Sequence, residues 1–243
     1  LCRSISFPCM RRMQAVHPSK RRFPVNTGNL EEVILSVAQI VPATEAEGPG
    51  LRFALWFQGC PLRCPGCCNP EMLTFEGGTP MSVADVLHQV DEARERGIEG
   101  ITLLGGEPMA HAPGAAILAR EVQARGLTVM AFTGFTLEEI RERGEPAMQQ
   151  LVNLCDILVD GPYVREQPDH TRRWIGSTNQ RIHFLSDRYS FDDSWKKSNT
   201  LEIRLEQGVL TVNGFPAREA VGLWKRPKFR KTLPLREDDS AKP

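Results

Sequence analysis

The chain has 243 residues, of which 41% are hydrophobic and 25% charged, a balance typical of a globular protein with one sizeable core. No apolar run approaches the roughly 18 residues of a membrane-spanning helix, so we expect no membrane partner. The formal net charge of +0 conceals an uneven distribution, because residues 31–224 are acidic and both ends of the chain are basic.

The charge distribution suggests a division into four parts. We expect no nucleic-acid partner, because basic ends are more simply explained as solvated, flexible segments. We place the natural start of the chain at Met10 or Met13. The four expected parts are a flexible basic arm (1–30), a core domain (31–186), a linker with a β-hairpin (187–224) and a basic disordered tail (225–243).

The first elements lead to an unusual loop. A short apolar run within residues 31–43 predicts a small strand or cap. Residues 51–57 are bulky and apolar between turn signals, which predicts a buried strand. Directly after it, residues 58–71 read QGCPLRCPGCCNPE, and the prolines and glycines exclude a regular helix or strand there.

Three cysteines of this loop have the spacing of a metal cluster. Cys60, Cys64 and Cys67 form a C-x3-C-x2-C pattern. Iron–sulfur clusters are held by cysteine thiolates, and a cubane ligated only by cysteines needs four of them. Three ligands therefore predict a single 4Fe-4S cluster with one iron left open for chemistry.

A disulfide framework, a zinc site and a ferredoxin all fit these cysteines less well. Disulfide frameworks belong to secreted chains, and the seven cysteines indicate instead a reducing compartment, so we expect a cytoplasmic protein. Zinc sites use paired C-x2-C knuckles or Cys with His, and no His lies near this loop. A bacterial-type ferredoxin needs a fourth cysteine nearby, and we do not expect Cys68, adjacent to Cys67, to join the same cluster.

The rest of the chain alternates strands and helices. Apolar runs predict strands at 100–104, 127–132, 155–159 and 180–185, and apolar stripes predict helices at 81–97, at 113–125 and from Thr136 onward. A long polar loop at 161–179 precedes the fifth strand, and a polar linker at 187–200 follows it. Residues 201–205 and 209–212 predict a β-hairpin.

This order of elements predicts an α/β fold. Strand–helix repetition with short connections predicts parallel strands, and their number is too small for an eight-fold barrel. We therefore expect a partial, open β/α barrel with a parallel sheet and a C-terminal β-hairpin extension. Cys60, Glu107, Thr133 and Asp160 all follow strand ends, so they should meet at the carboxyl edge, where β/α barrels build their sites.

The glycine pair that follows the second barrel strand is a candidate binding site. Gly105 and Gly106 allow a ligand to approach the backbone, and Glu107 adds a carboxylate beside them. Paired glycines are also common in ordinary turns, so the motif alone is weak.

Further candidates lie at or beyond the other strand ends. Thr133 also suits a helix cap, and Asp160 also suits a turn. Arg181 presents a planar fork to a cofactor carboxylate, and an ion pair on the surface accounts for it nearly as well. Asn69 is a loop residue for which contact with a cofactor is open.

The cysteine loop and the segment before the first buried strand resemble motifs of a known superfamily. The C-x3-C-x2-C loop after an apolar strand resembles the radical S-adenosylmethionine superfamily, although Gly66 replaces the aromatic residue usual there. Residues 64–71 (CPGCCNPE) and 47–52 (EGPGLR) are similar to the glycyl-radical-enzyme activating group. Within that group, the activating proteins of anaerobic ribonucleoside-triphosphate reductases are most similar, and the resemblance covers about residues 36–184.

The resemblance implies roles for the candidate residues. Cys60, Cys64 and Cys67 would hold the catalytic 4Fe-4S cluster, and Gly105, Gly106 and Glu107 would hold the methionine amino group of S-adenosylmethionine. Thr133 and Asp160 would lie near that cofactor.

The resemblance also implies a reaction. The reduced cluster would cleave S-adenosylmethionine to a 5′-deoxyadenosyl radical, which takes hydrogen from a glycine of a partner glycyl-radical enzyme. That partner would be of the anaerobic ribonucleoside-triphosphate reductase type, and a flavodoxin or ferredoxin would be the reductant. Two alternatives stay open: radical modification of a peptide or small metabolite, and a non-catalytic iron–sulfur electron carrier.

Overall fold

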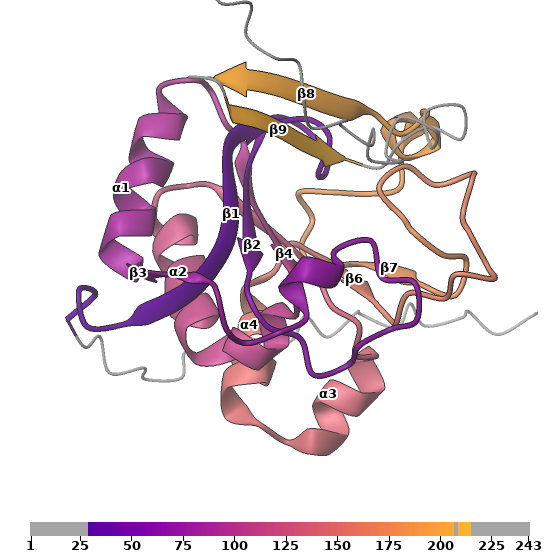
Figure 1. Cartoon of the computed structure of the whole chain (residues 1–243), viewed down its shortest axis with the longest axis horizontal. Coiled ribbons are helices and arrows are strands. Elements are labelled where there is room, and N and C mark those ends of the chain that lie inside the picture. The colour runs from indigo at the N-terminus through magenta and orange to yellow at the C-terminus, as the bar shows by residue number, and fades with distance from the viewer. Residues whose placement is uncertain (1–28, 207–208, 215–243) are drawn as a thin grey trace, which may run out of the picture.

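The computed structural model describes residues 29–206 and 209–214 of the chain (Figure 1). The central sheet has seven strands in the order β3-β1-β2-β4-β5-β6-β7, and β8 and β9 form a separate two-stranded sheet. The strands are β1 (Ile34–Thr44), β2 (Arg52–Phe57), β3 (Thr79–Ser82), β4 (Gly100–Gly105), β5 (Thr128–Phe132), β6 (Ile157–Asp160), β7 (Arg181–Phe184), β8 (Leu201–Glu206) and β9 (Val209–Gly214). The α-helices are α1 (Val83–Arg94), α2 (Ala112–Ala124), α3 (Leu137–Arg143) and α4 (Pro146–Leu154).

The centre of the sheet is parallel, and its edges are not. β2, β4, β5 and β6 are parallel neighbours, as the strand–helix repetition predicted. β1 and β3 add antiparallel strands at one edge, and β7 adds another at the opposite edge. The described loop from β6 to β7 contains no helix, and without such a crossover the chain returns antiparallel. The sheet is therefore mixed, with a largely parallel centre.

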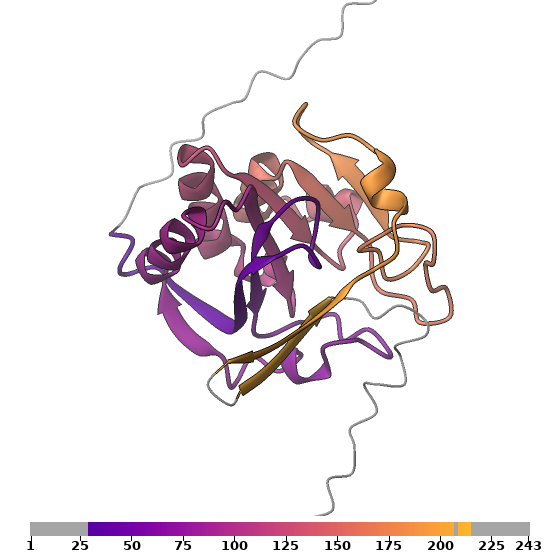
Figure 2. The same ribbon diagram turned by 90° about the horizontal axis from the view of Figure 1, so that it is seen from above.

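The two faces of the sheet have different covers. Phe53, Leu55 and Phe57 alternate along β2 and are fully buried in the cluster that packs against α1, α2 and α4. Trp56, between them, points to the other face. Figure 2 shows the helices on one side of the sheet, with the cysteine loop and the β8–β9 hairpin on the other. A helix layer thus fills one face and leaves the other for a site.

Helix boundaries follow local capping signals. Ser82 and Asp85 form a capping box at the start of α1, and Thr136 and Glu139 form another at the start of α3. The helix predicted from Thr136 is in fact two helices, because Gly144 ends α3 with a φ of 66° and α4 begins at Pro146. The strand β3 just before α1 was not predicted.

The segment after β7 also contributes to the core. Trp195, in a short 3-10 helix (Asp193–Lys196), is 1% exposed and packs edge-on against Trp174, with 5.0 Å between ring centroids. The residues expected to form a polar linker therefore pack on the second face of the sheet. The β8–β9 hairpin is confirmed, and it ends two residues later than predicted.

Most of the predicted arm (1–28) and the whole predicted tail (225–243) lie outside the described residues. Among the helices that are described, none has the length and apolar character needed to cross a bilayer.

Candidate functional site

The cysteine loop is closed at its base by hydrogen bonds. The Gln58 side-chain amide donates to the carbonyl oxygens of Glu71 (3.0 Å) and Thr74 (2.7 Å). The Gly59 N–H donates to Met72 O at 3.0 Å, and the Cys60 N–H donates to Leu73 O at 3.2 Å. These bonds join the two ends of the loop, so the cysteines between them are held beside the end of β2.

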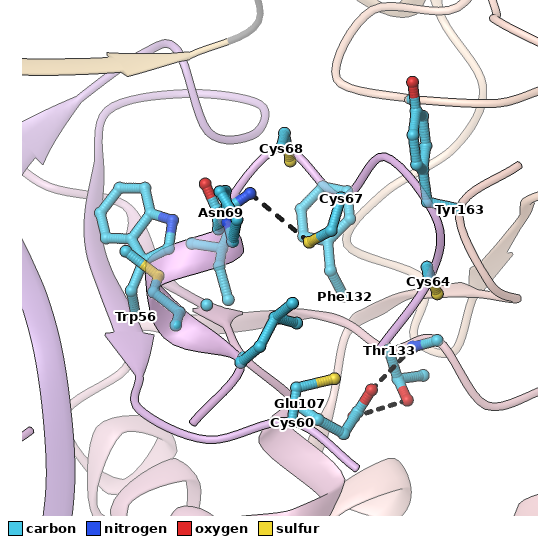
Figure 3. A pocket seen from close by; sticks show the side chains of 18 of the residues that line it. Trp56, Cys60, Cys64, Cys67, Cys68, Asn69, Glu107, Phe132, Thr133 and Tyr163 are labelled. Atoms are coloured by element: carbon cyan, nitrogen blue, oxygen red, sulfur yellow. Dashed lines mark hydrogen bonds between the residues drawn. The ribbon is translucent and has the colours of Figure 1, made fainter. Parts of the chain in front are cut away.

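All three cysteines line one cavity of about 1010 Å³. Cys60 is buried, and Cys64 and Cys67 are half-buried. Figure 3 shows the three side chains around one open space, with Glu107 and Thr133 at one end of it. The sheet supplies an apolar wall from the ends of three parallel strands, namely Trp56, Leu104 and Phe132.

The donor set fits a cluster better than a single ion. Within residues 29–206 and 209–214, no three His, Cys, Asp or Glu side chains come close enough to share one metal ion. A cubane presents a different iron to each cysteine, so its ligands surround a group much larger than an ion. Three thiols from one loop around a cavity of this size suit such a group.

The loop gives its cysteines different acidities. A hydrogen bond with the Cys68 thiol, together with the Asn69 N–H 3.4 Å from Cys67 Sγ, lowers the pKa of Cys67 to about 6 although burial opposes this shift. Burial raises the pKa of Cys64. A thiolate is the form that binds metal, so Cys67 is prepared for ligation in the metal-free protein. Asn69 lines the cavity and also supplies this N–H.

The glycine pair at the end of β4 packs directly against the cysteine loop. Gly105 has a φ of 101°. A Cβ on Gly106 would stand 2.2 Å from the Gly59 carbonyl oxygen. The Gly106 N–H donates to Phe57 O (2.8 Å), and the Glu107 N–H donates to Gly59 O (3.0 Å). The absence of side chains thus allows β4 to meet the loop.

Glu107 is 1% exposed and lies at the cavity wall. Its Oε1 accepts from Met109 N (2.9 Å) and Thr133 Oγ1 (2.8 Å), and its Oε2 accepts from Gly134 N (2.8 Å). Burial raises the pKa of Glu107 to about 7, although these three hydrogen bonds favour the charged form. The structure thus brings Glu107 and Thr133 to the cavity in direct contact with each other.

Asp160 and Arg181 are placed differently. Neither is among the cavity-lining residues found in the described part of the chain. Asp160 is fully buried and accepts from Arg181 Nε (3.0 Å) and from the Leu137 N–H (2.7 Å) at the start of α3. Arg181 also pairs with Glu138. The ion pair that the sequence allowed for Arg181 is therefore present, while the neighbours Gly161 and Gln180 line the cavity.

Glu47 and Asn213 are among the cavity residues that were not identified as candidates from the sequence. Glu47 is 5% exposed, and burial raises its pKa to about 7. Asn213, in β9, places Nδ2 3.4 Å from Glu47 Oε1 and 2.9 Å from Thr44 Oγ1. The Gly-Pro-Gly turn after Glu47 was a usable signal for a site residue. Nothing local marked Asn213, which is 166 residues away from Glu47.

Comparisons with known proteins identify the family of this chain. Residues 46–183 match the model of a family described as a 4Fe-4S single cluster domain. The chain is 32% identical over 154 residues to the anaerobic ribonucleoside-triphosphate reductase-activating protein of Escherichia coli strain K12, a match covering 60% of this chain and 97% of that protein. It is 31% identical over 152 residues to the protein of that name from Vibrio cholerae, covering 60% and 95%.

A more distant relative and a solved structure also match. The activating protein of the same name from phage T4 is 28% identical over 153 residues, covering 61% of this chain and 94% of that protein. Among solved structures, the chain is similar to QueE from Escherichia coli, with a TM-score of 0.36 and 17% identity over 43% of this chain and 54% of that chain. The β8–β9 hairpin begins after the last residue of the family match.

Proposed function

We propose that this chain, which belongs to the family of anaerobic ribonucleoside-triphosphate reductase-activating proteins and contains a 4Fe-4S single cluster domain, is a radical S-adenosylmethionine activase. It binds one 4Fe-4S cluster and S-adenosylmethionine, and it takes a hydrogen atom from a glycine of a partner glycyl-radical enzyme. The partner is an anaerobic ribonucleoside-triphosphate reductase.

One observation carries this proposal. One cavity is lined by the three cysteines Cys60, Cys64 and Cys67. It is also lined by Gly105, Gly106 and Glu107, which follow from the end of a neighbouring parallel strand. Three cysteines that can ligate a cluster form one half of a site for a cluster and a sulfonium cofactor. A carboxylate beside glycine backbone, which can bind the free amino group of that cofactor, forms the other half. Each half alone could be structural, whereas their convergence from separate elements is what a functional site requires.

When bound, the cluster and S-adenosylmethionine would supply the difficult chemistry, namely one-electron reductive cleavage of the sulfonium to methionine and a 5′-deoxyadenosyl radical. The protein holds and orients these groups. Cys60, Cys64 and Cys67 would each hold one iron of the cluster, and Glu107 would accept a hydrogen bond from the methionine amino group. The apolar wall of Trp56, Leu104 and Phe132 excludes water from the reacting end of the cavity.

The remaining candidates act around this centre. Thr133 holds the carboxylate of Glu107 in place at 2.8 Å, and Asn69 supports Cys67 through its backbone N–H. Asp160 and Arg181 act at one remove by fixing the start of α3.

Three further features belong to the proposal. The reductant is a flavodoxin or ferredoxin-type protein, the activase works in the cytoplasm, and its sheet is a partial, open β/α barrel. What supports the barrel is the group of four parallel strands with the cavity at their carboxyl ends. We also propose that the chain is divided into a core domain (31–186) and a hairpin extension (187–224).

Anaerobic reconstitution tests the proposal. The purified chain is loaded with iron and sulfide, reduced with dithionite, and assayed for 5′-deoxyadenosine from S-adenosylmethionine. The wild type should produce it, and Cys64→Ala should lose this activity while its far-UV circular dichroism stays unchanged. A matched control, Cys155→Ala, removes a buried cysteine outside the cavity and should keep the activity if it folds.

A second measurement tests the partner. After incubation with the anaerobic reductase, electron paramagnetic resonance should show a glycyl radical. Cleavage of S-adenosylmethionine without this signal would favour radical modification of a peptide or metabolite instead. That alternative has one observation in its support, because the hairpin at the cavity lies beyond the family match. A cluster that yields no deoxyadenosine at all would indicate an electron carrier.

A further inference from the structure

The β8–β9 hairpin is attached to the body of the protein by its polar face. Glu202 accepts a hydrogen bond from the Glu45 N–H at 3.0 Å, and Arg204 donates to the Ala43 carbonyl at 2.6 Å. On β9, the Asn213 side chain donates to Thr44 Oγ1 at 2.9 Å. The hairpin thus sits on the end of β1 and the turn after it, as Figure 1 shows.

The opposite face of the hairpin is apolar and uncovered within the described structure. Side chains alternate between the faces of a strand, so Ile203 and Leu205 point away from the side of Glu202 and Arg204. Ile203 is 60% exposed, and Leu205 is 72% exposed. A hairpin normally buries its apolar face on the body and turns its polar face to water. Within the described residues this arrangement is reversed, which leaves the apolar face available for a binding partner.

The apolar face continues into the cavity. Val212 pairs with Ile203 in register, and directly opposite residues of an antiparallel pair share a face. Val212 also lines the cavity, together with Asn213 and Gly214. The uncovered face of the hairpin is therefore an extension of the cavity rim, and a molecule that reaches into the cavity past β9 passes over it.

We propose that the apolar face of the β8–β9 hairpin is a docking surface for the polypeptide substrate, and that it binds an extended segment with apolar side chains next to the target glycine. This inference rests on the proposed function and adds the surface by which the partner is recognised. A protein substrate suits the site better than a small metabolite, because two large exposed side chains outside the cavity serve only a ligand that extends beyond it.

The geometry of a hairpin suits such a segment. Each strand of a two-stranded sheet has one unpaired edge, to which an extended peptide can add by main-chain hydrogen bonds. The apolar side chains of alternate residues then give the selectivity. Because the hairpin lies outside the family match, we expect this surface to set which partner the chain accepts, while the chemistry stays with the cysteine loop.

The test uses the reconstituted holoenzyme and the anaerobic ribonucleoside-triphosphate reductase of the same organism. The variant is Ile203→Ser combined with Leu205→Ser. The control is Ile34→Ser, since Ile34 is also a largely exposed isoleucine (58%) but lies at the start of β1, whose far end at Thr44 meets the hairpin. All three side chains are exposed, so the variants should fold.

The double variant should produce 5′-deoxyadenosine without partner at the wild-type rate. Its KM for the reductase, measured from the glycyl radical signal, should rise about tenfold with kcat unchanged, and the control should match the wild type. An unchanged KM would overturn the proposal. So would a wild-type dimer that the double variant converts to a monomer, because a second copy would then be the occupant.

The two proposals fail in different ways. If the wild type cleaves S-adenosylmethionine but never raises a glycyl radical on the reductase, the proposed function itself is wrong, and the docking surface falls with it. If the wild type raises the radical and the double variant does so at the same reductase concentrations, only the docking surface is wrong.

Discussion

At the scale of single residues, Glu107 is the side chain on which the site depends most. Three donors surround its carboxylate, namely two backbone N–H groups and the Thr133 hydroxyl. The same carboxylate therefore holds the ends of β4 and β5 together and faces the cavity. A buried carboxylate that accepts three hydrogen bonds from the protein tolerates little change, because a buried donor left without an acceptor costs about 1–3 kcal/mol.

We predict that Glu107→Gln weakens both the fold and cofactor binding. The amide NH₂ of Gln must face at least one of the three donors, so the variant should lose about 1–3 kcal/mol in its free energy of unfolding. Its Kd for S-adenosylmethionine, measured by isothermal titration with the reconstituted protein, should rise at least about tenfold.

The matched control for this change is Glu142→Gln, an exposed residue of α3 that should leave both quantities unchanged. A Glu107→Gln variant that unfolds at the wild-type urea concentration and binds the cofactor normally would contradict the role of this carboxylate.

At the scale of elements, the junction between β4 and the cysteine loop decides the shape of the site. Two backbones meet there without side chains between them, since Gly106 lies against Gly59. The sequence identified the glycine pair, but it did not show that the cysteine loop packs against this pair. The sequence suggested that a ligand approaches the glycines, whereas the structure shows that the cysteine loop itself makes the close contact with Gly106.

We predict that Gly106→Ala displaces the cysteine loop and impairs cluster loading. The new Cβ would stand 2.2 Å from the Gly59 carbonyl oxygen, which is backbone and cannot rotate away. After anaerobic reconstitution, the variant should lose most of its bound iron and sulfide and the associated visible absorbance.

Gly97→Ala is the comparison for this change. Gly97 has a φ of 83° with open space around it, so alanine there causes backbone strain of about 1–2 kcal/mol without touching the loop. Equal iron contents in the two variants would show that the contact at Gly106 does not matter for loading.

At the scale of the whole molecule, buried polar groups link distant parts of the chain. Arg52 is fully buried and donates to Thr102 Oγ1 (2.6 Å), Thr128 Oγ1 (3.2 Å) and the Tyr189 hydroxyl (3.2 Å). It thereby joins β2, β4 and β5 to the segment after β7. Glu47 and Glu107 are buried too, and both carry a raised pKa near neutrality, so they couple global stability to pH.

We predict that the metal-free protein loses stability as the pH rises from about 4.5 to about 7. Folding raises the pKa of Glu47 and of Glu107 from 4.5 to about 7. In this window the folded state keeps protons that the unfolded chain has released, so raising the pH favours unfolding. Each carboxyl should contribute roughly 3 kcal/mol to the fall.

Urea denaturation at about pH 5 and about pH 8 measures this fall. Glu47→Gln, which does not ionise, should show a smaller loss of stability between the two pH values than the wild type. Parallel losses in the wild type and Glu47→Gln would contradict a raised pKa at Glu47.

Local patterns allowed much of the fold to be predicted. Apolar runs located four parallel strands, apolar stripes located the helices to within a few residues, and the strand ends pointed to a common edge. Two strands of the sheet, β3 and β7, were not predicted correctly. β3 contains a proline and only four residues, too little for a strand pattern, and β7 reversed direction because no helix precedes it.

The sequence by itself determined the cysteine loop and the edge at which it lies, because ligand spacing and strand order are properties of neighbouring residues. Only the tertiary structure decided that Asp160 pairs with Arg181 instead of lining the cavity, and that Asn213 joins its wall. Asn213 and Thr44 are separated by 169 residues, and a contact over such a distance depends on how the whole chain packs. For the same reason, the reversed hairpin at the cavity rim could not be read from its own residues.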